Sequence, residues 1–184
     1  MIFIPQSIPE VVLIVPTVHG DERGYFSETF RNDTFKDSIG YQVDFIQDNE
    51  SKSSKGVLRG LHYQLPPYTQ SKLVRVIEGS VLDVAVDIRK SSPTFGQHVA
   101  VELTSENKHQ LFVPRGFAHG FVVLCNDTIF SYKVDNYYSP EYDRGILFSD
   151  PNLSIDWRLH QDILMLSKKD LNHPCLEETY DLFD

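Results

Sequence analysis

His62, in the run Arg59-Gly-Leu-His-Tyr-Gln64, is the side chain of this sequence best suited to proton transfer. An imidazole titrates near neutral pH, so it can take a proton from a weak acid and exchange it with solvent. A second histidine, His119, ends the run Pro114-Arg-Gly-Phe-Ala-His119, which fits a PxGxxH pattern. These two histidines are the first candidates for a common site.

The two histidines lack the neighbours that a metal site needs. A divalent ion usually takes three or four protein nitrogen or carboxylate ligands. Gln64 stands where an HxH pair would place its second histidine, and Glu78 is a weak further candidate. We therefore expect neither a metal ion nor any other cofactor, and we interpret His62 as a base that works without a metal.

Length and composition indicate one mainly β domain that spans residues 1–184. Hydrophobic residues make up 41% of the 184 positions, enough for one full core and too little for two. The 10 Gly, 10 Pro, 12 Phe and 9 Tyr are spread along the chain, which favours many short strands and turns over a helical bundle.

Charge and cysteine usage exclude several classes of protein. The formal net charge is -9 and the sequence has no cluster of Lys and Arg residues. We therefore expect no nucleic-acid partner and no anionic-membrane surface. Cys125 and Cys175 show neither CxxC nor histidine spacing, which argues against a zinc site and a disulfide framework. The apolar N-terminal stretch is short and broken by prolines, so we expect a cytoplasmic protein.

Strand-like runs separated by turn signals cover most of the chain. The clearest is a hairpin over Leu73–Ile88 that turns at Glu78-Gly79-Ser80. Its second arm alternates between an apolar face (Leu82, Val84, Val86, Ile88) and a face that carries the carboxylates Asp83 and Asp87, directed at solvent or at a barrel interior.

The remaining runs predict about ten short strands in all and few helices. Strands are expected at Val11–Val18, Gly24–Phe30, Gln42–Asn49, Val57–Tyr63, Gln97–Leu103, Gly120–Leu124 and Thr128–Val134, the last two joined by a turn at Cys125-Asn-Asp127. Helix signals are confined to Asn32–Ile39, closed by Gly40, and to a C-terminal stretch near Ser167-Lys-Lys-Asp170.

The PxGxxH run and the Gly60-Leu-His62 run resemble the two halves of a cupin site. The resemblance implies a cupin-type jelly-roll, or double-stranded β-helix, barrel with a few short helices. Many cupins bind a metal through HxH and a downstream Glu, and Gln64 departs from that pattern.

A closer resemblance covers the chain from about Gly20 to Asp170. The runs that carry it, in order, are Asp21-Glu-Arg-Gly-Tyr-Phe-Ser-Glu28, Gln47-Asp-Asn49, Leu58-Arg-Gly-Leu-His-Tyr-Gln64, Gln70-Ser-Lys-Leu-Val-Arg75, Asp83-Val-Ala-Val-Asp-Ile-Arg89, Ser92-Pro-Thr-Phe-Gly96, Val113-Pro-Arg-Gly-Phe-Ala-His-Gly-Phe121, Tyr132-Lys133 and Leu166-Ser-Lys-Lys-Asp170. Together they resemble the dTDP-4-dehydrorhamnose 3,5-epimerase family, isomerases of dTDP-rhamnose biosynthesis that supply cell-surface polysaccharide.

The resemblance implies a catalytic set of four residues. The carbons beside the carbonyl of a 4-keto sugar are acidic, and epimerisation there needs a base, an enolate stabiliser and an acid on the opposite face. His62 matches the family's base and Asp170 the carboxylate that orients it. Lys72 matches the cation that faces the developing oxyanion, and Tyr132 the proton donor.

Further matches imply contacts with a nucleotide-sugar partner, a dTDP-4-keto-6-deoxy-hexose. Cationic and polar contacts fall on Arg23, Glu28, Gln47, Asn49, Arg59, His119, Asp143 and Lys169, and aromatic stacking on Phe26 or Tyr138. Asp143 departs from the family, which commonly has Glu there. Its side chain is one methylene shorter, which puts a nucleotide contact at this position in doubt.

Each candidate also has a structural interpretation. His62 alone is compatible with a hydrogen-bonded core histidine, and Lys72 with a solvated strand charge. Tyr132 in a strand commonly packs in a core, and Asp170 could cap a short C-terminal helix. The ordered combination of all four in one family's positions favours catalysis.

Three functions remain open at this point. The first is 3,5-epimerisation of dTDP-4-dehydro-6-deoxy-D-glucose to dTDP-4-dehydro-L-rhamnose. The second is a mono-epimerase acting at C3 or C5 only, or an epimerase of another nucleoside-diphosphate 4-keto sugar. The third is a non-catalytic sugar-binding cupin. The resemblance further implies a homodimer in which N-terminal strands within residues 1–30 reach into the partner.

Overall fold

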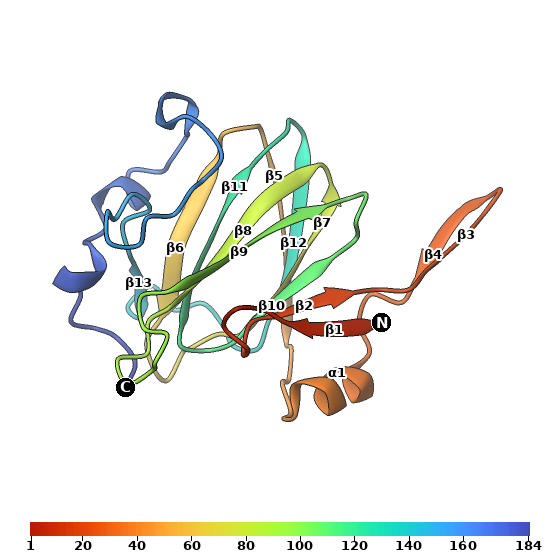
Figure 1. Cartoon of the computed structure of the whole chain (residues 1–184), viewed down its shortest axis with the longest axis horizontal. Coiled ribbons are helices and arrows are strands. Elements are labelled where there is room, and N and C mark those ends of the chain that lie inside the picture. The colour runs from red at the N-terminus through yellow and green to blue at the C-terminus, as the bar shows by residue number, and fades with distance from the viewer.

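Two antiparallel sheets face each other in the computed structural model, which describes all 184 residues (Figure 1). The larger sheet has six strands in the order β1-β2-β10-β7-β12-β5, and the smaller has five in the order β13-β6-β11-β8-β9. A separate hairpin, β3-β4, projects from the body near the N-terminus.

The strands run in chain order as follows: β1 Ile2–Pro5, β2 Val12–Val15, β3 Val18–Asp21, β4 Gly24–Ser27, β5 Gln47–Ser53, β6 Leu58–Gln64, β7 Lys72–Glu78, β8 Ser80–Asp87, β9 His98–Thr104, β10 Gln110–Val113, β11 Phe117–Val123, β12 Thr128–Val134 and β13 Asp143–Gly145. The one α-helix is α1, Asn32–Ile39, and three 3-10 helices follow late in the chain: η1 Gln161–Ile163, η2 Asp170–Asn172 and η3 Leu176–Glu178.

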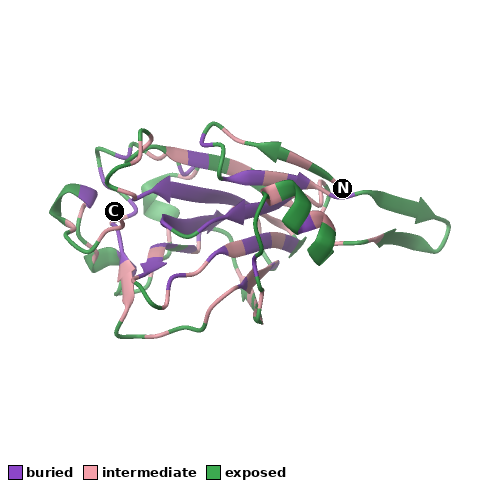
Figure 2. Cartoon of the chain, turned by 90° about the horizontal axis from the view of Figure 1, so that it is seen from below, coloured by how far each residue is buried: buried purple, intermediate pink, exposed green.

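Apolar side chains form three layers around the two sheets. One cluster lies between the sheets and includes Val74, Val81, Ala85 and Phe130. The outer face of the five-stranded sheet is covered by the C-terminal segment, and the outer face of the six-stranded sheet by α1 and its neighbours. Figure 2 shows the buried residues concentrated on the strands, with the β3-β4 hairpin and much of α1 exposed.

Both faces of β8 are buried, which refines the expectation from sequence. The apolar face packs beneath the C-terminal segment through residues such as Leu82 and Val84. The other face, with Asp83 and Asp87, points between the sheets, and both carboxylates are inaccessible to solvent. The alternating carboxylates therefore face a barrel interior rather than water.

Helix α1 is confirmed with the predicted bounds. It ends at Gly40, whose left-handed backbone (φ 89°) lets its N–H bond the carbonyl of Lys36. Its one buried residue, Phe35, meets Phe112 of β10 edge-on at 5.1 Å between ring centroids. The helix thereby closes the outer face of the six-stranded sheet.

Several predicted element bounds were wrong. The run Val11–Val18 is divided between β2 and β3, because Pro16 has no N–H with which to continue a ladder. The strand expected at Gln42–Asn49 begins only at Gln47, and Gly24–Phe30 is a strand only as far as Ser27. The hairpin β7-β8 is confirmed.

Some elements of the structure were not predicted from the sequence. Strands β1, β10 and β13 are three or four residues long, too short to show alternation. The C-terminal helix signal corresponds only to the 3-10 turn η2. No helix in the structure has the length and apolar character needed to cross a membrane.

Candidate active site

A cavity of about 310 Å³ opens between the two sheets at one end of the barrel. It is lined by Glu50, Ser51, Arg59, His62, Lys72, His119, Phe121, Phe130, Tyr132, Ser167, Lys169 and Asp170. All four predicted catalytic residues are in this set. They come from β6, β7, β12 and the C-terminal segment, so only the folded chain brings them together.

Strands β6 and β11 place the two histidines side by side. His119 is paired with His62 in the antiparallel register, and the register shifts just after His119. The strands approach closely at Gly60 and Gly120, where a Cβ on Gly60 would lie 2.5 Å from the Gly120 Cα. Glycine is required there because any side chain would push the two strands apart.

His62 and Asp170 form a close pair across 108 residues of sequence. His62 Nε2 lies 2.5 Å from Asp170 Oδ1, and Asp170 Oδ2 accepts a hydrogen bond of 2.8 Å from the Ser167 hydroxyl. An ionised carboxylate only accepts, so the His62 proton sits on Nε2 and leaves Nδ1 with a lone pair. This arrangement makes His62 a base of fixed tautomer.

Asp170 stays ionised despite its burial. Burial acts to raise its pKa, but the hydrogen bonds from His62 and Ser167 outweigh burial and hold the pKa below its ordinary value. Asp170 does not cap a helix, since Lys169 occupies the cap position of η2. The interpretation of Asp170 as a helix cap is therefore wrong.

Lys72 is one of three cationic side chains that line the cavity, with Arg59 and Lys169. Its amino group has no salt-bridge partner within the protein, and burial lowers its pKa to about 8, while the charges of Asp83 and Asp143 act in the opposite direction. Lys72 is thus mostly protonated at neutral pH, and it faces the cavity as a poorly solvated positive charge. Such a charge stabilises a developing oxyanion strongly.

Tyr132 reaches the cavity from β12, in the sheet opposite to His62. Burial raises the pKa of its phenol, while the nearby Arg59 lowers it by a smaller amount. The phenol therefore remains protonated and available as a donor near neutral pH. An acid and a base carried on opposite sheets can address opposite faces of a substrate held between them.

Aromatic and polar side chains complete the inner surface. Phe121 and Phe130 stack with ring centroids 4.0 Å apart. On β5, Gln47 donates a 2.8 Å hydrogen bond to Asn49, which is paired in register with Tyr132. Gln47 and Asn49 thus lie on the strand next to Tyr132, but neither is among the residues that line this cavity.

His119 has an aspartate partner that sequence reasoning did not assign to the site. Its Nε2 lies 2.9 and 3.0 Å from the two carboxylate oxygens of Asp83, and both side chains are buried. The signal was the alternation of carboxylates with apolar residues along β8. The sequence left the direction of that face undecided.

Three other predicted residues meet at the rim of the cavity. Lys169 Nζ forms an ion pair with Asp143 Oδ2, and the Tyr138 hydroxyl donates to the same oxygen at 2.8 Å. The Asp143 carboxylate is therefore already bound by Lys169 and Tyr138. A glutamate at this position would reach one methylene further.

Arg23, Phe26 and Glu28 are not brought to the cavity of their own chain. They lie on or just after the β3-β4 hairpin, whose strands pair only with each other. Arg23 pairs with Asp21 at the hairpin tip, and Phe26 is 71% exposed.

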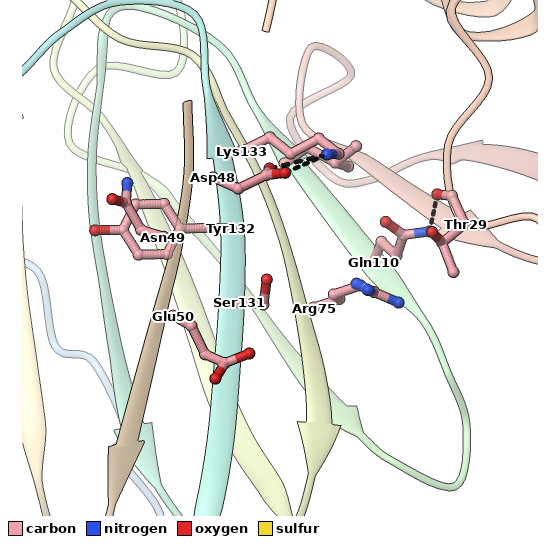
Figure 3. Close-up of a pocket in the computed structure, with 10 residues that line it drawn as sticks. Thr29, Asp48, Asn49, Glu50, Arg75, Gln110, Ser131, Tyr132 and Lys133 are labelled. Carbon is pink, nitrogen blue, oxygen red and sulfur yellow. Dashed lines mark hydrogen bonds and ion pairs between the residues drawn. The ribbon is translucent and has the colours of Figure 1, made fainter. Parts of the chain in front are cut away.

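A second hollow, of about 310 Å³, lies on the other side of the six-stranded sheet (Figure 3). Figure 3 shows the exposed Asp48–Lys133 ion pair and the hydrogen bond from Gln110 to the Thr29 carbonyl there, with the Tyr132 ring directed away from them beside Asn49. Tyr132 borders both hollows, but this one contains no histidine, and only the inner cavity joins Tyr132 to His62, Asp170 and Lys72.

Gln64 is engaged by the backbone. Its amide donates to the carbonyls of Tyr68 and Tyr137 at 2.7 and 3.1 Å and accepts from the Ser139 N–H at 2.6 Å. These bonds occupy the side chain that stands where a cupin would place a metal-binding histidine. Glu78, at the far end of β7, is exposed.

Two facing antiparallel sheets around an acid–base pocket define the class as a cupin-type jelly-roll barrel. A sequence profile described as dTDP-4-dehydrorhamnose 3,5-epimerase matches residues 5–178. The chain is 56% identical over 169 residues to the enzyme of that name from Shigella flexneri, covering 92% of this chain and 92% of the relative. The chain belongs to the dTDP-4-dehydrorhamnose 3,5-epimerase family.

Solved structures agree with this assignment. A Legionella pneumophila 3,5-epimerase in complex with dTDP-4-keto-L-rhamnose matches with a TM-score of 0.92 and 49% identity, covering 96% of this chain and 93% of that one. The 3'-monoepimerase ChmJ from Streptomyces bikiniensis, in complex with dTDP-quinovose, matches with a TM-score of 0.87 and 33% identity, over 94% of this chain and 87% of its own. The jelly-roll fold predicted from sequence is confirmed.

Proposed function

We propose that this chain epimerises dTDP-4-dehydro-6-deoxy-D-glucose at C3 and C5 to give dTDP-4-dehydro-L-rhamnose, the step before reduction to dTDP-rhamnose. The observation that carries the proposal is the placement of the His62–Asp170 pair and Tyr132 on opposite sides of one cavity that also holds Lys72. Family membership supports the same reaction.

The reaction begins with proton removal beside the C4 carbonyl. His62 Nδ1 takes the proton from carbon, and the electron pair of the C–H bond moves into an enolate with negative charge on O4. Asp170 stabilises the imidazolium that forms, and Lys72 stabilises the oxyanion. No metal takes part in this sequence of steps.

Inversion follows when the enolate carbon is protonated from the other face. The Tyr132 hydroxyl gives its proton to the carbon, the C4 carbonyl re-forms, and the phenolate recovers a proton from solvent. Although a phenol is a weak acid in water, an enolate carbon is basic enough to accept its proton. After His62 has released its proton to solvent, repeating these steps at the second carbon completes the 3,5-epimerisation.

The nucleotide is recognised by the rim of the cavity and by the hairpin of a second copy. Arg59, His119 and Lys169 supply donors to sugar hydroxyls or diphosphate oxygens, and Tyr138 offers a face for the thymine. Asp143 can turn toward the substrate only by giving up its ion pair with Lys169. We therefore assign Asp143 a weaker role than the longer Glu would have.

The projecting β3-β4 hairpin supports a homodimer. Its Tyr25 and Phe26 are 62% and 71% exposed, an unusual state for two adjacent aromatic residues in a free surface hairpin. If a second copy receives the hairpin, Arg23, Phe26 and Glu28 complete that copy's pocket. We also place the protein in the cytosol, where Cys125 and Cys175, both free thiols, stay reduced.

A mono-epimerase is the second candidate, because a 3'-monoepimerase has the same fold as this chain. The identity to that enzyme is 33%, against 49% and 56% to the two 3,5-epimerases above, which favours two carbons. A non-catalytic sugar-binding cupin has no use for an ionised aspartate behind a histidine base, so it is the least favoured.

One experiment separates the three. The protein is incubated with dTDP-4-keto-6-deoxy-glucose in heavy water, and deuterium is followed at each carbon by NMR. We expect label at both C3 and C5. Label at one carbon would establish a mono-epimerase instead, and tight binding without label would contradict catalysis altogether.

A further inference from the structure

His173 is a partly buried histidine next to the catalytic pair that the proposed reaction does not use. Its Nε2 is buried and no protein group forms a hydrogen bond with it. That atom lies 3.8 Å from Asp170 Oδ1, the same oxygen that pairs with His62. The rings of His62 and His173 meet edge-on at 5.6 Å between centroids. A buried polar atom without a partner is costly and calls for an explanation.

The backbone of β13 holds the His173 ring in place. Gly145 is paired in register with His62, and a Cβ at Gly145 would lie 2.4 Å from His173 Nε2. Just after His173, the carbonyl of Pro174 accepts a 2.8 Å hydrogen bond from the Leu147 N–H, which ties this segment to the sheet. The ring therefore cannot turn away from Asp170 easily.

Three ligand atoms of the kinds that zinc prefers converge here. Single atoms of His62, Asp170 and His173 all lie within 4.8 Å of one another. Zinc takes imidazole nitrogens and carboxylate oxygens at about 2.0–2.2 Å, so a small movement of one side chain brings all three within reach of one ion. Two imidazoles favour zinc over magnesium or calcium, which prefer oxygen ligands.

We propose that His62, Asp170 and His173 form an inhibitory zinc site, in which a Zn²⁺ ion binds His62 Nε2, Asp170 Oδ1 and His173 Nε2 and leaves one position for water. This site is distinct from the metal position of other cupins, since neither His119 nor Gln64 contributes to it. It adds to the proposed epimerase reaction, in which zinc has no role.

Occupation of the site would stop proton abstraction by a simple change of tautomer. Zinc takes the lone pair of His62 Nε2, so the single proton of the neutral ring moves to Nδ1. Nδ1 is the nitrogen that must accept the substrate proton, and it can no longer do so. The ion also takes the carboxylate that would stabilise the imidazolium.

The test measures zinc binding directly, so it does not depend on the proposed activity. Zinc sulfate is titrated into the full-length protein in competition with a chromophoric chelator. We expect one Zn²⁺ per chain in the wild type and at least about tenfold weaker binding in His173→Phe, since losing even an outer partner of a zinc ligand costs 10–100-fold. His160→Phe, at an exposed histidine outside this three-residue cluster, is the matched control and should bind as the wild type does.

A second arm follows turnover of each variant with chelator and with added zinc. Added zinc should lower the turnover rate sharply, relative to the rate with chelator, for the wild type and for His160→Phe. It should lower the rate of His173→Phe much less. His173→Gln serves the same purpose if the phenylalanine variant fails to fold. Unaltered zinc affinity in the His173 variants, or no zinc binding by the wild type, would overturn the proposal. A wild type that binds zinc but shows no turnover with chelator would instead contradict the epimerase function alone.

Discussion

Two histidine–aspartate pairs stand side by side in this barrel and differ in how they meet the cavity. His62 uses one nitrogen to meet a single oxygen of Asp170 at 2.5 Å, and 31% of its side chain is accessible. His119 Nε2 lies 2.9 and 3.0 Å from the two oxygens of Asp83, and only 7% of the His119 side chain is accessible.

The difference shows how the same two residue types acquire different roles. Asp170 comes from the C-terminal segment, outside the sheet, and accepts a hydrogen bond from Ser167. Its partner His62 keeps part of its side chain accessible. Asp83 lies on β8, the strand next to β11, so its pair with His119 is part of the sheet. The accessible pair can exchange protons with substrate and solvent. In the enclosed pair, the buried Asp83 fixes the orientation of the His119 ring and places a negative charge beside it.

The largest effect should come from breaking the accessible pair. His62→Asn removes the base and leaves a side chain of similar polarity, so we expect kcat to fall by about 10⁴-fold, the upper end for general base catalysis. His119→Asn is the matched variant in the enclosed pair and should lose far less. Steady-state turnover of both variants measures the contrast, and equal losses would mean that the two pairs share one role.

Removal of the Lys72 charge from the cavity should have the next largest effect. Lys72→Met leaves the oxyanion without its cation, and we expect kcat to fall by about 10³-fold. In the wild type, turnover should decline as pH rises above about 8, because Lys72 loses its proton there. A pH–rate profile checks both points. A wild-type rate that stays level to pH 10 would contradict the assignment of the cation to Lys72.

Tyr132→Phe tests the acid that faces the accessible pair. Proton removal by His62 should continue while protonation from the far face fails, so product formation should fall by about 10²-fold and exchange of the substrate proton by much less. Quenched-flow NMR in heavy water separates the two rates. If both fell equally, Tyr132 would be needed for proton removal as well.

A smaller and more specific change is expected from Asp83→Asn in the enclosed pair. The Asp83 charge raises the pKa of Lys72 against the effect of burial, so its loss should lower that pKa below about 8. We expect turnover at neutral pH to fall by about tenfold and the alkaline decline to begin at lower pH. An unchanged profile would show that Asp83 acts only on His119.

The smallest effect on turnover should come from Asp87→Asn, four residues further along the same strand and outside the cavity. Asp87 is buried and accepts hydrogen bonds from Arg89, Ser92 and Thr94, which outweigh burial and lower its pKa to about 2. A lowered pKa stabilises the fold above the unfolded value near 3.8, and this stabilisation is lost as pH falls toward 2.

We therefore expect Asp87→Asn to lower the free energy of unfolding at pH 7 by about 1–3 kcal/mol while leaving the pH–rate profile as it is. Denaturant unfolding at pH 7 and at pH 2 measures the effect. A loss of the same size at pH 2, where the wild-type carboxylate is itself half protonated, would contradict this account of the network.

Sequence predicted the accessible pair better than the enclosed one. His62 lies in a distinctive run, and resemblance to a family supplied Asp170 as its partner. Helix α1 and the β7-β8 hairpin were predicted because each combines a clear period with a glycine that ends or turns it. These features are local, so a single sequence carries them.

What sequence did not predict depends on distant packing. Whether Asp83 faced water or a barrel interior followed only from the second sheet, which covers that face of β8. His173 carries no motif, and its contact with His62 arises because β13 and the C-terminal segment meet on β6. The position of Arg23 and Phe26 outside their own chain's cavity likewise follows from the projection of the hairpin.

Deuterium exchange in the two histidine variants tests most directly whether the accessible pair is the base. Each is incubated in heavy water with dTDP-4-keto-6-deoxy-glucose, and label at C3 and C5 is followed by NMR. We predict no label at either carbon with His62→Asn, and label at both carbons, at a reduced rate, with His119→Asn. Label appearing with His62→Asn at the wild-type rate would contradict the account.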